Sequence, residues 1–523
     1  MPKTTPIEIN ERFQQALDLM ENTDHHLFIT GKAGTGKSTL LDHFRKITRK
    51  RVAILAPTGV AALNVAGQTI HSFCGFRPDI ALEKVKKITD KDSDRAVLYR
   101  KLDIIIIDEV SMVRADLLDC VEKFLRLNGP RPKQPFGGIQ MIFIGDLYQL
   151  PPVVTSAEKN IFKLQYESPY FFSSHVFMDP KFKMEFVELE KIYRQTEEDF
   201  IVLLNAIRNR SVTDADIDRL NRNCTPDFIP PEDDLFLYLT STNDQAFWQN
   251  QEKLNRLPGK AYTYEGLIEG EFDKSSFPTD KVLGLKAGSQ VMLLNNDPLG
   301  RWVNGSIGKV TKILHKKGEE DVIRVELPGN LIVPVTPHTW KIFRYAFDEK
   351  ARKIYSEPMG SFTQYPIKLA WAITIHKSQG KTFDRVIIDI GRGTFAHGQV
   401  YVALSRCTSL QGIVLRQPIR KHHILMDWRV IHFLTRFQYQ KSEEKLAYAD
   451  KVQMIEIAMG GRKDLEIVYL KPDDTKSRRR IRPESIEILE YKGKQFEGLR
   501  AFCHERRDLR HFRIDRILEI KNL

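Results

Sequence analysis

A glycine-rich loop near the start of the chain has the residue types and the spacing of a phosphate-binding site. The segment Gly31-Lys-Ala-Gly-Thr-Gly-Lys-Ser38 follows an apolar run and precedes a helical pattern, although a glycine-rich turn that matches by chance is the alternative. Glycines let backbone N–H groups curl around an anion, and the positive end of the following helix attracts it. A lysine and a serine at these positions reach the β- and γ-phosphates and a magnesium ion, respectively. The predicted nucleotide contacts are Gly31, Ala33, Gly34, Thr35, Gly36, Lys37, Ser38 and Thr39, of which Lys37 is also catalytic and Ser38 also a Mg²⁺ ligand.

An acidic pair lies downstream, at the end of the apolar run 103–107. A carboxylate at the end of a buried strand is costly unless a cation compensates it, and a bound metal ion does so. Asp108 is therefore expected to hold Mg²⁺ through water, and Glu109 to polarise the water that attacks the nucleotide. An Asp-Glu pair after a strand is common by chance, so its weight comes from the glycine-rich loop upstream.

A third candidate is Gln149, in the segment Gly145-Asp-Leu-Tyr-Gln-Leu-Pro-Pro152 that follows the apolar run 141–144. The paired prolines cannot continue a helix and so favour a loop beside the phosphates. There Gln149 would sense the γ-phosphate or orient water, although an ordinary turn residue is the alternative.

The elements that must position these residues are short apolar runs that alternate with amphipathic stretches. Such runs, separated by helical segments, are typical of a parallel sheet covered by helices, which binds ligands at the carboxyl ends of its strands. Two groups of runs, before and after about residue 188, predict an α/β fold with two lobes. The runs are His26–Thr30, Val52–Ala56, Asp103–Ile107, Met141–Ile144, Phe236–Leu239 and Arg385–Ile390.

Between about residues 286 and 365 the pattern changes to short β-rich pieces separated by Gly, Pro and Asn. This texture predicts a small antiparallel barrel inserted into the second lobe. Residues 438–453 have the composition of a linker or connecting helix, and residues 455–523 are again strand-like and rich in arginine. The β-rich pieces of the insert are Ser289–Leu294, Ile307–Ile313, Val322–Leu327 and Leu331–Val335.

The composition is that of a globular protein with several domains. The chain has 523 residues, 42% hydrophobic and 28% charged, with a formal net charge of +12 and a pI of about 9.2. A basic balance favours a polyanionic partner such as nucleic acid, although many proteins are mildly basic. The five cysteines lack disulfide or zinc spacing, and the first ten residues lack the apolar core of a signal peptide. No apolar stretch reaches the roughly 18 residues that span a bilayer, so we expect a cytoplasmic protein with no membrane partner.

Further motifs, in order along about residues 9–427, resemble the bacterial form of the Pif (petite integration frequency) family of superfamily 1B DNA helicases. The resemblance implies two RecA-like lobes that bind ATP and Mg²⁺ between them. It also implies an SH3-like β-barrel in the second lobe, with its tightest turn at Asn304–Gly308. Besides the loop and the acidic pair, the motifs are Ala56–Ala62, Thr69–Phe73, Glu109–Leu118, Leu189–Gln195, Thr374–Gly380 and Gln399–Arg406.

The resemblance assigns further roles at the nucleotide. Arg194 and Arg406 would be arginine fingers that stabilise charge on the transferring phosphoryl group. A lone arginine more often forms a surface ion pair, so only their motifs single these two out. Gly380 would contact the nucleotide, and Gln15 would read adenine, with Gln14 or a solvated helix face as the alternatives. The predicted catalytic residues are Lys37, Glu109, Gln149, Arg194 and Arg406.

The resemblance also implies that both lobes contact one DNA strand. Small hydroxyls and backbone N–H groups suit phosphates, and a His or Phe ring can stack on a base without reading its sequence. Core packing is the alternative for Phe73, and a buried position is the alternative for His376. The implied DNA contacts are Pro57, Thr58, Gly59, His71, Ser72 and Phe73 in the first lobe, and Ser241, Thr242, Asn243, His376, Lys377 and Ser378 in the second.

The C-terminal segment resembles a WYL domain, a small β-rich fold that binds nucleic acid or a negatively charged ligand. Arginines gather at 478–482, 500–507 and 510–516, but Phe496-Glu-Gly stands where the tripeptide that names the domain is expected. Over residues 455–523 there are 17 basic and 13 acidic residues. An accessory module for single-stranded DNA or a ligand is expected, and a plain solvated surface is the alternative.

Together these features predict an ATP-dependent 5′-to-3′ DNA helicase or translocase that unwinds duplex or structured DNA in replication, repair or recombination. The polarity is implied by the resemblance alone. We expect a monomer associated with the bacterial nucleoid. The expected domains are residues 1–187 (first lobe, with a small wedge at about 64–79), 188–297 and 366–437 (second lobe), 298–365 (SH3-like domain), 438–454 (linker) and 455–523 (WYL-like domain).

Two rival functions differ from a helicase in class. A P-loop kinase or simple phosphatase predicts a lone phosphate site and gives no reason for the motifs at 374–380 and 399–406. A DNA-binding regulator with a vestigial nucleotide site is opposed by the intact Lys37, Glu109 and Arg406.

Overall fold

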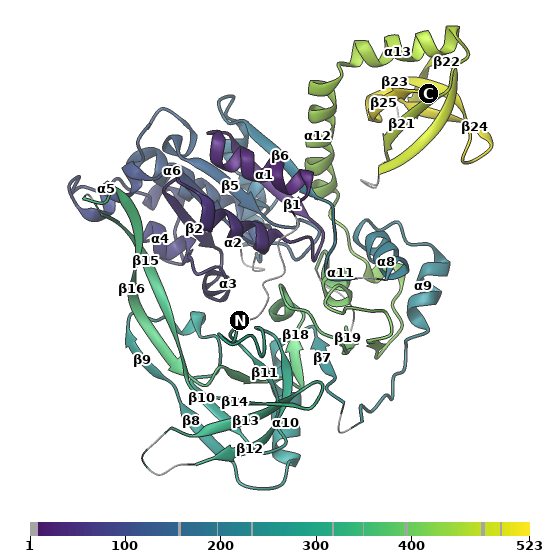
Figure 1. Ribbon diagram of the computed structural model, residues 1–523. Helices are drawn as coiled ribbons and strands as arrows, with labels where there is room; N and C mark the ends of the chain where they lie inside the picture. The colour runs from purple at the N-terminus through teal and green to yellow at the C-terminus, as the bar shows by residue number, and fades with distance from the viewer. Residues whose placement is uncertain are drawn as a thin grey trace. The chain divides into compact units, whose positions relative to one another are not determined.

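Apolar runs that alternate with helices build the first sheet of the computed structural model (Figure 1). Its six strands lie in the order β3-β2-β4-β5-β1-β6, and every neighbouring pair is parallel. The strands are β1 (His26–Gly31), β2 (Val52–Ala56), β3 (Gln68–Thr69), β4 (Ile104–Ile107), β5 (Gln140–Ile144) and β6 (Met184–Leu189). The helices are α1 (Glu11–Asn22), α2 (Lys37–Ile47), α3 (Gly59–Asn64), α4 (Ile70–Cys74), α5 (Asp94–Lys101), α6 (Ala115–Asn128) and α7 (Lys159–Gln165).

The structure describes residues 9–523 except 155–157, 196, 232–233, 316–317, 319, 349, 392, 394–395, 472–475 and 492–493. Residues 1–8, the start of the expected first lobe, lie outside the described residues. The chain forms two compact units, residues 1–207 with 212–425 and residues 208–211 with 426–523.

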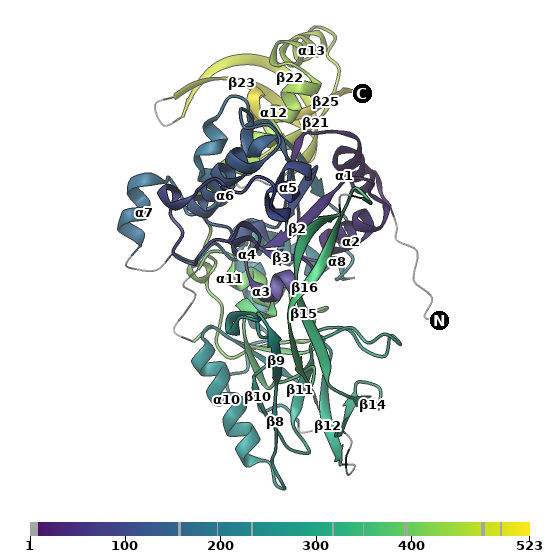
Figure 2. The ribbon, with the colours of Figure 1, turned by 90° about the vertical axis from the view of Figure 1, so that its left-hand side faces the viewer.

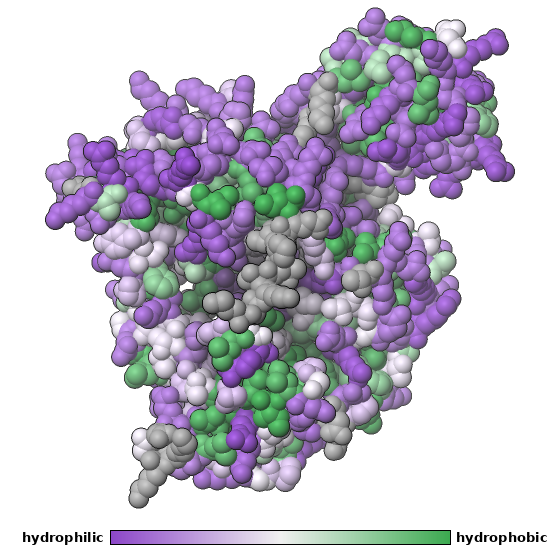
Figure 3. Space-filling view, in the orientation of Figure 1, coloured by the Kyte–Doolittle hydropathy of each residue, from purple (hydrophilic) through white to green (hydrophobic). Residues whose placement is uncertain are grey.

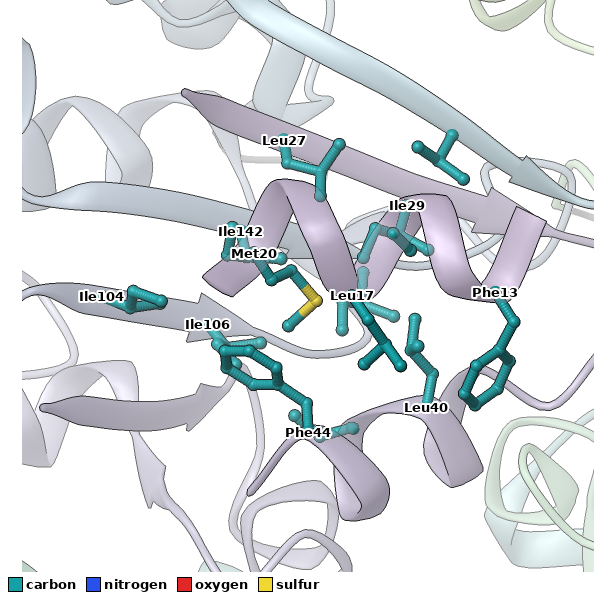
Figure 4. Packing of buried hydrophobic residues seen from close by; sticks show 14 of the residues in the cluster. Phe13, Leu17, Met20, Leu27, Ile29, Leu40, Phe44, Ile104, Ile106 and Ile142 are labelled. Atoms are coloured by element: carbon teal, nitrogen blue, oxygen red, sulfur yellow. The ribbon is translucent and has the colours of Figure 1, made fainter. Parts of the chain in front are cut away.

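The core under α1 fixes the position of the glycine-rich loop. Phe13 and Leu17 of α1 pack with Leu40 and Phe44 of α2 and with Ile29 of β1 (Figure 4). These apolar positions recur every three or four residues, so each helix turns one apolar face to the sheet. The loop between β1 and α2 is thereby held at the carboxyl end of the sheet.

A second parallel sheet, in the order β18-β7-β19-β20, forms the second lobe. β7 and β19 correspond to predicted apolar runs, whereas β18 and β20 are three residues long and gave no clear pattern. The two parallel sheets confirm the predicted α/β class. The strands are β7 (Leu237–Thr240), β18 (Ala372–Thr374), β19 (Val386–Asp389) and β20 (Ile413–Leu415), and the helices of this region are α8 (Glu198–Arg208), α9 (Asp214–Asn221), α10 (Asn243–Arg256) and α11 (Gln399–Leu404).

An antiparallel sheet, β14-β13-β12-β11-β17, is inserted between β7 and β18. It begins before the expected boundary at 298 and ends after 365, because β11 pairs with β17. The sheet has its own core, which includes Trp302, Val310 and Ile323. Its closure into an SH3-like barrel stays a prediction. The strands are β11 (Gln290–Leu293), β12 (Ile307–Leu314), β13 (Val322–Leu327), β14 (Leu331–Val335) and β17 (Ile367–Leu369).

A long hairpin that the sequence placed inside the barrel forms a separate sheet, β15-β16-β9. The hairpin reaches α4 and α5 of the first lobe (Figures 1 and 2). The Tyr345 hydroxyl also accepts a hydrogen bond from the N–H of Ile54, in β2, at 2.9 Å. The hairpin therefore ties the insert to the first lobe, a contact that strand alternation cannot predict. The strands are β15 (His338–Asp348), β16 (Lys353–Gln364) and β9 (Leu267–Gly270), and β8 (Tyr262–Glu265) pairs with β10 (Val282–Leu285).

The C-terminal unit contains a five-stranded antiparallel sheet, β24-β23-β22-β21-β25. Two helices, α12 (Trp428–Lys445) and α13 (Tyr448–Gly460), occupy the expected linker, so the strands start later than residue 455. Figure 3 shows hydrophilic side chains over most of one face of the molecule, with smaller hydrophobic areas between them. Among the described residues, no helix has both the length and the apolar character needed to cross a membrane. The strands are β21 (Leu465–Leu470), β22 (Lys476–Tyr491), β23 (Lys494–Cys503), β24 (Asp508–Arg513) and β25 (Ile517–Asn522).

Candidate active site

A cavity of about 660 Å³ collects side chains from both lobes around the glycine-rich loop. This volume lies within the roughly 300–1,000 Å³ that is usual for ligand pockets. The lining residues of the first lobe are Phe13, Ala33, Gly34, Thr35, Gly36, Lys37, Ser38, Thr39, Glu109 and Gln149. The lining residues that come after β6 in sequence, from the side of the second lobe, are Tyr193, Arg194, Gly380, Thr382 and Arg406.

The glycine-rich loop has the backbone conformation of an anion cradle. Gly34 has a φ of 81°, in the left-handed region that glycine adopts without steric cost. A Cβ at Gly34 would lie 2.5 Å from the Cβ of Arg194, so the close approach of the arginine also requires glycine. The Lys37 ammonium donates to the carbonyl oxygens of Gly31 and Lys32, at 2.8 and 3.1 Å. The lysine is thus held inside the curve of the loop.

A tyrosine of the second lobe also reaches this loop. The Ala33 N–H donates to the hydroxyl of Tyr401 at 3.0 Å. Tyr401 lies in α11 and is 4% exposed. Sequence reasoning missed this contact because a phenol within an apolar helix carries no signal for phosphate chemistry. The bond joins the two sides of the cavity at the loop itself.

The acidic pair lies at the carboxyl end of β4, as predicted. Burial, and then the neighbouring Glu109, raise the pKa of Asp108 to about 7. Burial also raises the pKa of Glu109, although Lys37 and Arg406 oppose this shift. Glu109 has a φ of 50°, a conformation that costs about 1–3 kcal/mol in a non-glycine residue and is concentrated at functional sites. Crowded oxygen donors of this kind suit a divalent cation such as Mg²⁺.

Two arginines line the other side of the cavity. Arg406 is 1% exposed, and its guanidinium donates to the carbonyl oxygens of Val402 and Ser378, at 2.9 and 3.4 Å. Burial, and then Arg194, lower the pKa of Arg406 to about 9. Arg194 donates to the carbonyl oxygen of Ser405 at 3.2 Å, and burial lowers its pKa as well. Crowded guanidinium groups of this kind suit the phosphates of a nucleotide.

The loop after β5 connects the cavity with the second lobe. The Gln149 amide donates to Asp146 at 3.3 Å and accepts from Gln379 at 3.5 Å. His397 contacts the carbonyl oxygen of Leu147 at 3.0 Å. Gln149 is therefore placed to transmit a change in the cavity to the motif at 374–380.

Two predicted nucleotide contacts, Gln15 and Gly31, and one predicted Mg²⁺ ligand, Asp108, do not line the cavity. Gln15 accepts a hydrogen bond from Arg12 at 3.1 Å instead. The Gly31 carbonyl oxygen accepts a hydrogen bond from Lys37. Asp108 does not line the cavity but interacts electrostatically with Lys37, which does. The lining residues that sequence reasoning missed are Phe13, Tyr193 and Thr382, whose residue types carry no specific signal.

Half of the twelve predicted DNA contacts follow the carboxyl ends of β2 and β7, and the other half follow β3 and β18. The Thr58 hydroxyl caps α3 and the Thr242 hydroxyl caps α10, each by accepting a backbone N–H, at 3.2 and 3.3 Å. Exposed hydroxyls at helix N-termini suit phosphate oxygens. The exposed members of the predicted set are Thr58, Ser72, Thr242, Asn243 and Lys377, and the partly exposed ones are Pro57, Gly59, His71, Ser241 and His376.

Two of the predicted DNA contacts are buried in this arrangement. Phe73 is 3% exposed and meets the rings of Tyr99 and Tyr345 edge-on, so it packs in the core, the alternative that the sequence left open. The Ser378 side chain is also buried, and its hydroxyl donates to the carbonyl oxygen of Ile375 at 2.6 Å. Long-range packing buries the first, and the tight turn 376–378 turns the second inward.

The outer face of the C-terminal sheet carries a row of arginines. Arg478, Arg480 and Arg482 alternate along β22 and are exposed. The buried Asp464 carboxylate accepts from Arg480 and Arg482, both at 2.8 Å. Phe502 lies opposite Arg482 on β23. Cations interleaved with an aromatic ring suit single-stranded nucleic acid.

Two family models match separate parts of the chain. The family model described as PIF1-like helicase matches residues 8–218, and the one described as WYL domain matches residues 450–522, which confirms the prediction for the C-terminal segment. The ATP-dependent DNA helicase Pif1 of Bdellovibrio bacteriovorus is 32% identical over 439 residues, 83% of this chain and 93% of the relative. The chain spans 58–65% of the length of several eukaryotic relatives.

Solved structures agree with the fold. The crystal structure of Bacteroides sp Pif1 in complex with ADP-AlF4 is 36% identical, covers 83% of this chain and 98% of its own, and gives a TM-score of 0.75. Bacteroides Pif1 bound to ssDNA is also 36% identical, covers 82% of this chain and 96% of its own, and gives a TM-score of 0.59. The arrangement described here is therefore closer to the first.

Proposed function

The chain belongs to the PIF1-like helicase family, and we propose that it is an ATP-dependent DNA helicase that moves 5′ to 3′ on single-stranded DNA. The observation that carries the proposal is one cavity in which Lys37 and Glu109 meet Arg194 and Arg406. A kinase or simple phosphatase has no need of arginines supplied across two lobes. A vestigial site has no need of all four groups.

In this proposal the phosphates of ATP bind the glycine-rich loop and Lys37. Glu109 polarises the attacking water, while Arg194 and Arg406 stabilise charge on the transferring phosphoryl group. Because the arginines lie across the cavity, ATP draws the lobes together and hydrolysis releases them. Gln149 transmits this change through its hydrogen bond with Gln379. A strand held by both lobes then moves one step per cycle.

Ser38 and Asp108 are the proposed Mg²⁺ ligands. A hydroxyl and a carboxylate are the oxygen donors that Mg²⁺ prefers. The raised pKa of Asp108 marks a carboxylate whose ionised form is unstable in its buried place, and a cation there would stabilise that form. When bound, the ion would neutralise negative charge that develops on the phosphates during transfer.

Single-stranded DNA is the proposed track, and duplex or structured DNA the proposed substrate. Exposed hydroxyls at the starts of α3 and α10, together with Lys377, offer phosphate contacts on both lobes. We expect a monomer that acts on chromosomal DNA in the bacterial cytoplasm, in repair or recombination.

The proposed contribution of the WYL domain is a second site for single-stranded DNA on the arginine face of β22. It predicts that deletion of residues 455–523 weakens single-strand affinity, and unchanged affinity and unwinding would refute it.

The decisive experiment compares substrates with 5′ or 3′ single-stranded tails. The expected result is unwinding from the 5′ tail only, with ATP hydrolysis strongly stimulated by single-stranded DNA. Lys37→Ala and Glu109→Gln should abolish unwinding. Unwinding from a 3′ tail would refute the proposed polarity. ATP hydrolysis that single-stranded DNA does not stimulate would favour a P-loop kinase or simple phosphatase. Absence of ATP hydrolysis would favour a DNA-binding regulator with a vestigial nucleotide site.

A further inference from the structure

Three lysines gather where the second lobe meets the insert. Lys368 lies in β17, and Lys377 and Lys381 lie in and after the turn 376–378. Burial, and then Lys368, lower the pKa of Lys381 to about 8. Burial, and then Lys377, lower the pKa of Lys368, although Asp280 opposes this shift. Over the part of the chain that the structure describes, none of these three ammonium groups has a carboxylate oxygen within 4 Å.

The ammonium of Lys381 is held by a neutral amide. Asn304 Oδ1 accepts from Lys381 Nζ at 2.7 Å, and Asn304 Nδ2 donates to Asn64 Oδ1 at 3.2 Å. Asn64 is the last residue of α3, and Asn304 lies in the turn before β12. The series Asn64–Asn304–Lys381, the asparagine bridge, therefore links the first lobe, the insert and the second lobe.

The turn is shaped to bring Asn304 to the lysine. The Asn304 N–H donates to Asn296 Oδ1 at 2.8 Å, which fixes one side of the turn. Gly305 has a φ of 103°, which side chains rarely adopt, and a Cβ built there would lie 3.6 Å from Cβ and Cγ of Lys381. The aliphatic stem of Lys381 thus packs alongside the turn that holds its ammonium.

The backbone next to this lysine is held by the arginines of the nucleotide cavity. Arg194 donates to the carbonyl oxygen of Gly380 at 3.5 Å, and Arg406 donates to that of Lys381 at 3.4 Å. One residue therefore has its main chain at the nucleotide cavity and its side chain at the insert. A ligand that draws the side chain away from Asn304 acts on a segment that both arginines hold.

We propose that Lys368, Lys377 and Lys381 form a binding site for a backbone phosphate of single-stranded DNA, and that Asn304 occupies this site when no DNA is bound. The inference rests on the proposed helicase function and adds Lys368, Lys381 and the asparagine bridge to it. The Asn304 amide oxygen satisfies one N–H of the Lys381 ammonium but brings no negative charge to the three lysines. A phosphodiester supplies both the acceptor oxygens and the charge. Its binding displaces Asn304 from Lys381 and breaks the asparagine bridge.

The first arm of the test measures binding of a fluorescein-labelled oligothymidylate to the full chain over a series of salt concentrations. Lys381→Gln should weaken binding about tenfold at low salt. It should also reduce the slope of log Kd against log salt by about 0.7, the value for one phosphate contact on a single strand. The matched control is Lys312→Gln, an exposed lysine of β12 in the same insert, for which affinity and slope should be unchanged. An unchanged affinity and slope for Lys381→Gln would overturn the proposal.

The second arm removes the competitor and decides the question even if Lys381→Gln does not fold. Asn304→Ala should tighten binding about threefold or more with the same salt slope, because no amide has to be displaced. In combination with Lys381→Gln this gain should vanish. Asn304→Ala with the affinity of the original chain would overturn the proposal. If the original chain neither binds the oligothymidylate nor shows DNA-stimulated ATP hydrolysis, the proposed function itself fails.

Discussion

The two sides of the nucleotide cavity carry opposite charges, and burial perturbs them in opposite directions. On the first lobe, burial raises the pKa of Asp108 to about 7 and also raises that of Glu109. On the other side, burial lowers the pKa of Arg406 to about 9 and also lowers that of Arg194. Each side gathers like charges, which is unfavourable by itself. The difference indicates a site built for a ligand that brings both anionic phosphates and a cation.

The two sides also differ in how the chain assembles them. Asp108 and Glu109 are adjacent in sequence at the end of one strand. Arg194 and Arg406 are far apart in sequence and meet through the carbonyl oxygen of Ser405 and the segment 378–381. The acidic side is therefore a local feature, whereas the arginine side exists only when the second lobe has folded. We expect the coupling between hydrolysis and movement to depend on the arginine side.

The largest effect should come from removing one arginine. Arg194→Ala should reduce kcat for ATP by about 10³-fold or more, the usual range for an arginine finger, while nucleotide binding is retained. Steady-state hydrolysis and binding of a fluorescent nucleotide measure the two quantities. Arg49→Ala, at an exposed position after α2, is the control that should leave both unchanged. A kcat within tenfold of that of the original chain would contradict the role of Arg194 as an arginine finger.

Because the pKa of Asp108 is raised, the stability of the folded protein should depend on pH. The pKa of Asp108 is raised from 3.8 to about 7, so the folded state binds more protons than the unfolded state between these values. Stability contributed by this group therefore falls as pH rises through that window. Without nucleotide or Mg²⁺, Asp108→Asn should melt about 2–4 °C higher at pH 8, and the gain should shrink toward pH 4. A melting temperature that stays below that of the original chain at pH 8 would contradict a strained carboxylate.

The contact that joins the two sides at the loop should have a smaller effect. Tyr401→Phe keeps the ring but removes the hydroxyl that accepts the Ala33 N–H. A single hydrogen bond contributes about 0.5–1.5 kcal/mol, so kcat/KM for ATP should fall about two- to tenfold. Initial rates over a range of ATP concentrations provide the test. An unchanged kcat/KM would mean that this bond plays no part in nucleotide turnover.

The smallest effect is expected at the residue that the family resemblance assigned to adenine. Gln15 bonds to Arg12 and does not line the cavity, so Gln15→Ala should change KM for ATP by less than about twofold. The preference for ATP over GTP should also be unchanged. A loss of that preference would show that α1 reorients when nucleotide binds, and would restore the sequence prediction.

The sequence by itself determined the elements in which chemistry and local backbone preference coincide. The glycine-rich loop, the acidic pair and the loop of Gln149 each follow a short apolar run, and each lies at the carboxyl end of a strand of the first sheet. The bounds of β2, β13 and β14 coincide with predicted runs. Such features depend on neighbours within a few positions, because glycine freedom, strand burial and helix starts are local properties.

Only the tertiary structure decided which of these residues meet and which are hidden. Phe73 is buried against Tyr99 of α5 and Tyr345 of the hairpin β15-β16. Tyr401 contacts the glycine-rich loop from a helix that lies 368 positions later in the chain. Asn304 contacts Lys381, although several strands separate the two residues in sequence. Long-range contacts are set by how whole faces pack, and residue type or spacing along the chain does not encode that choice locally. The cavity that unites acids and arginines is a product of that packing.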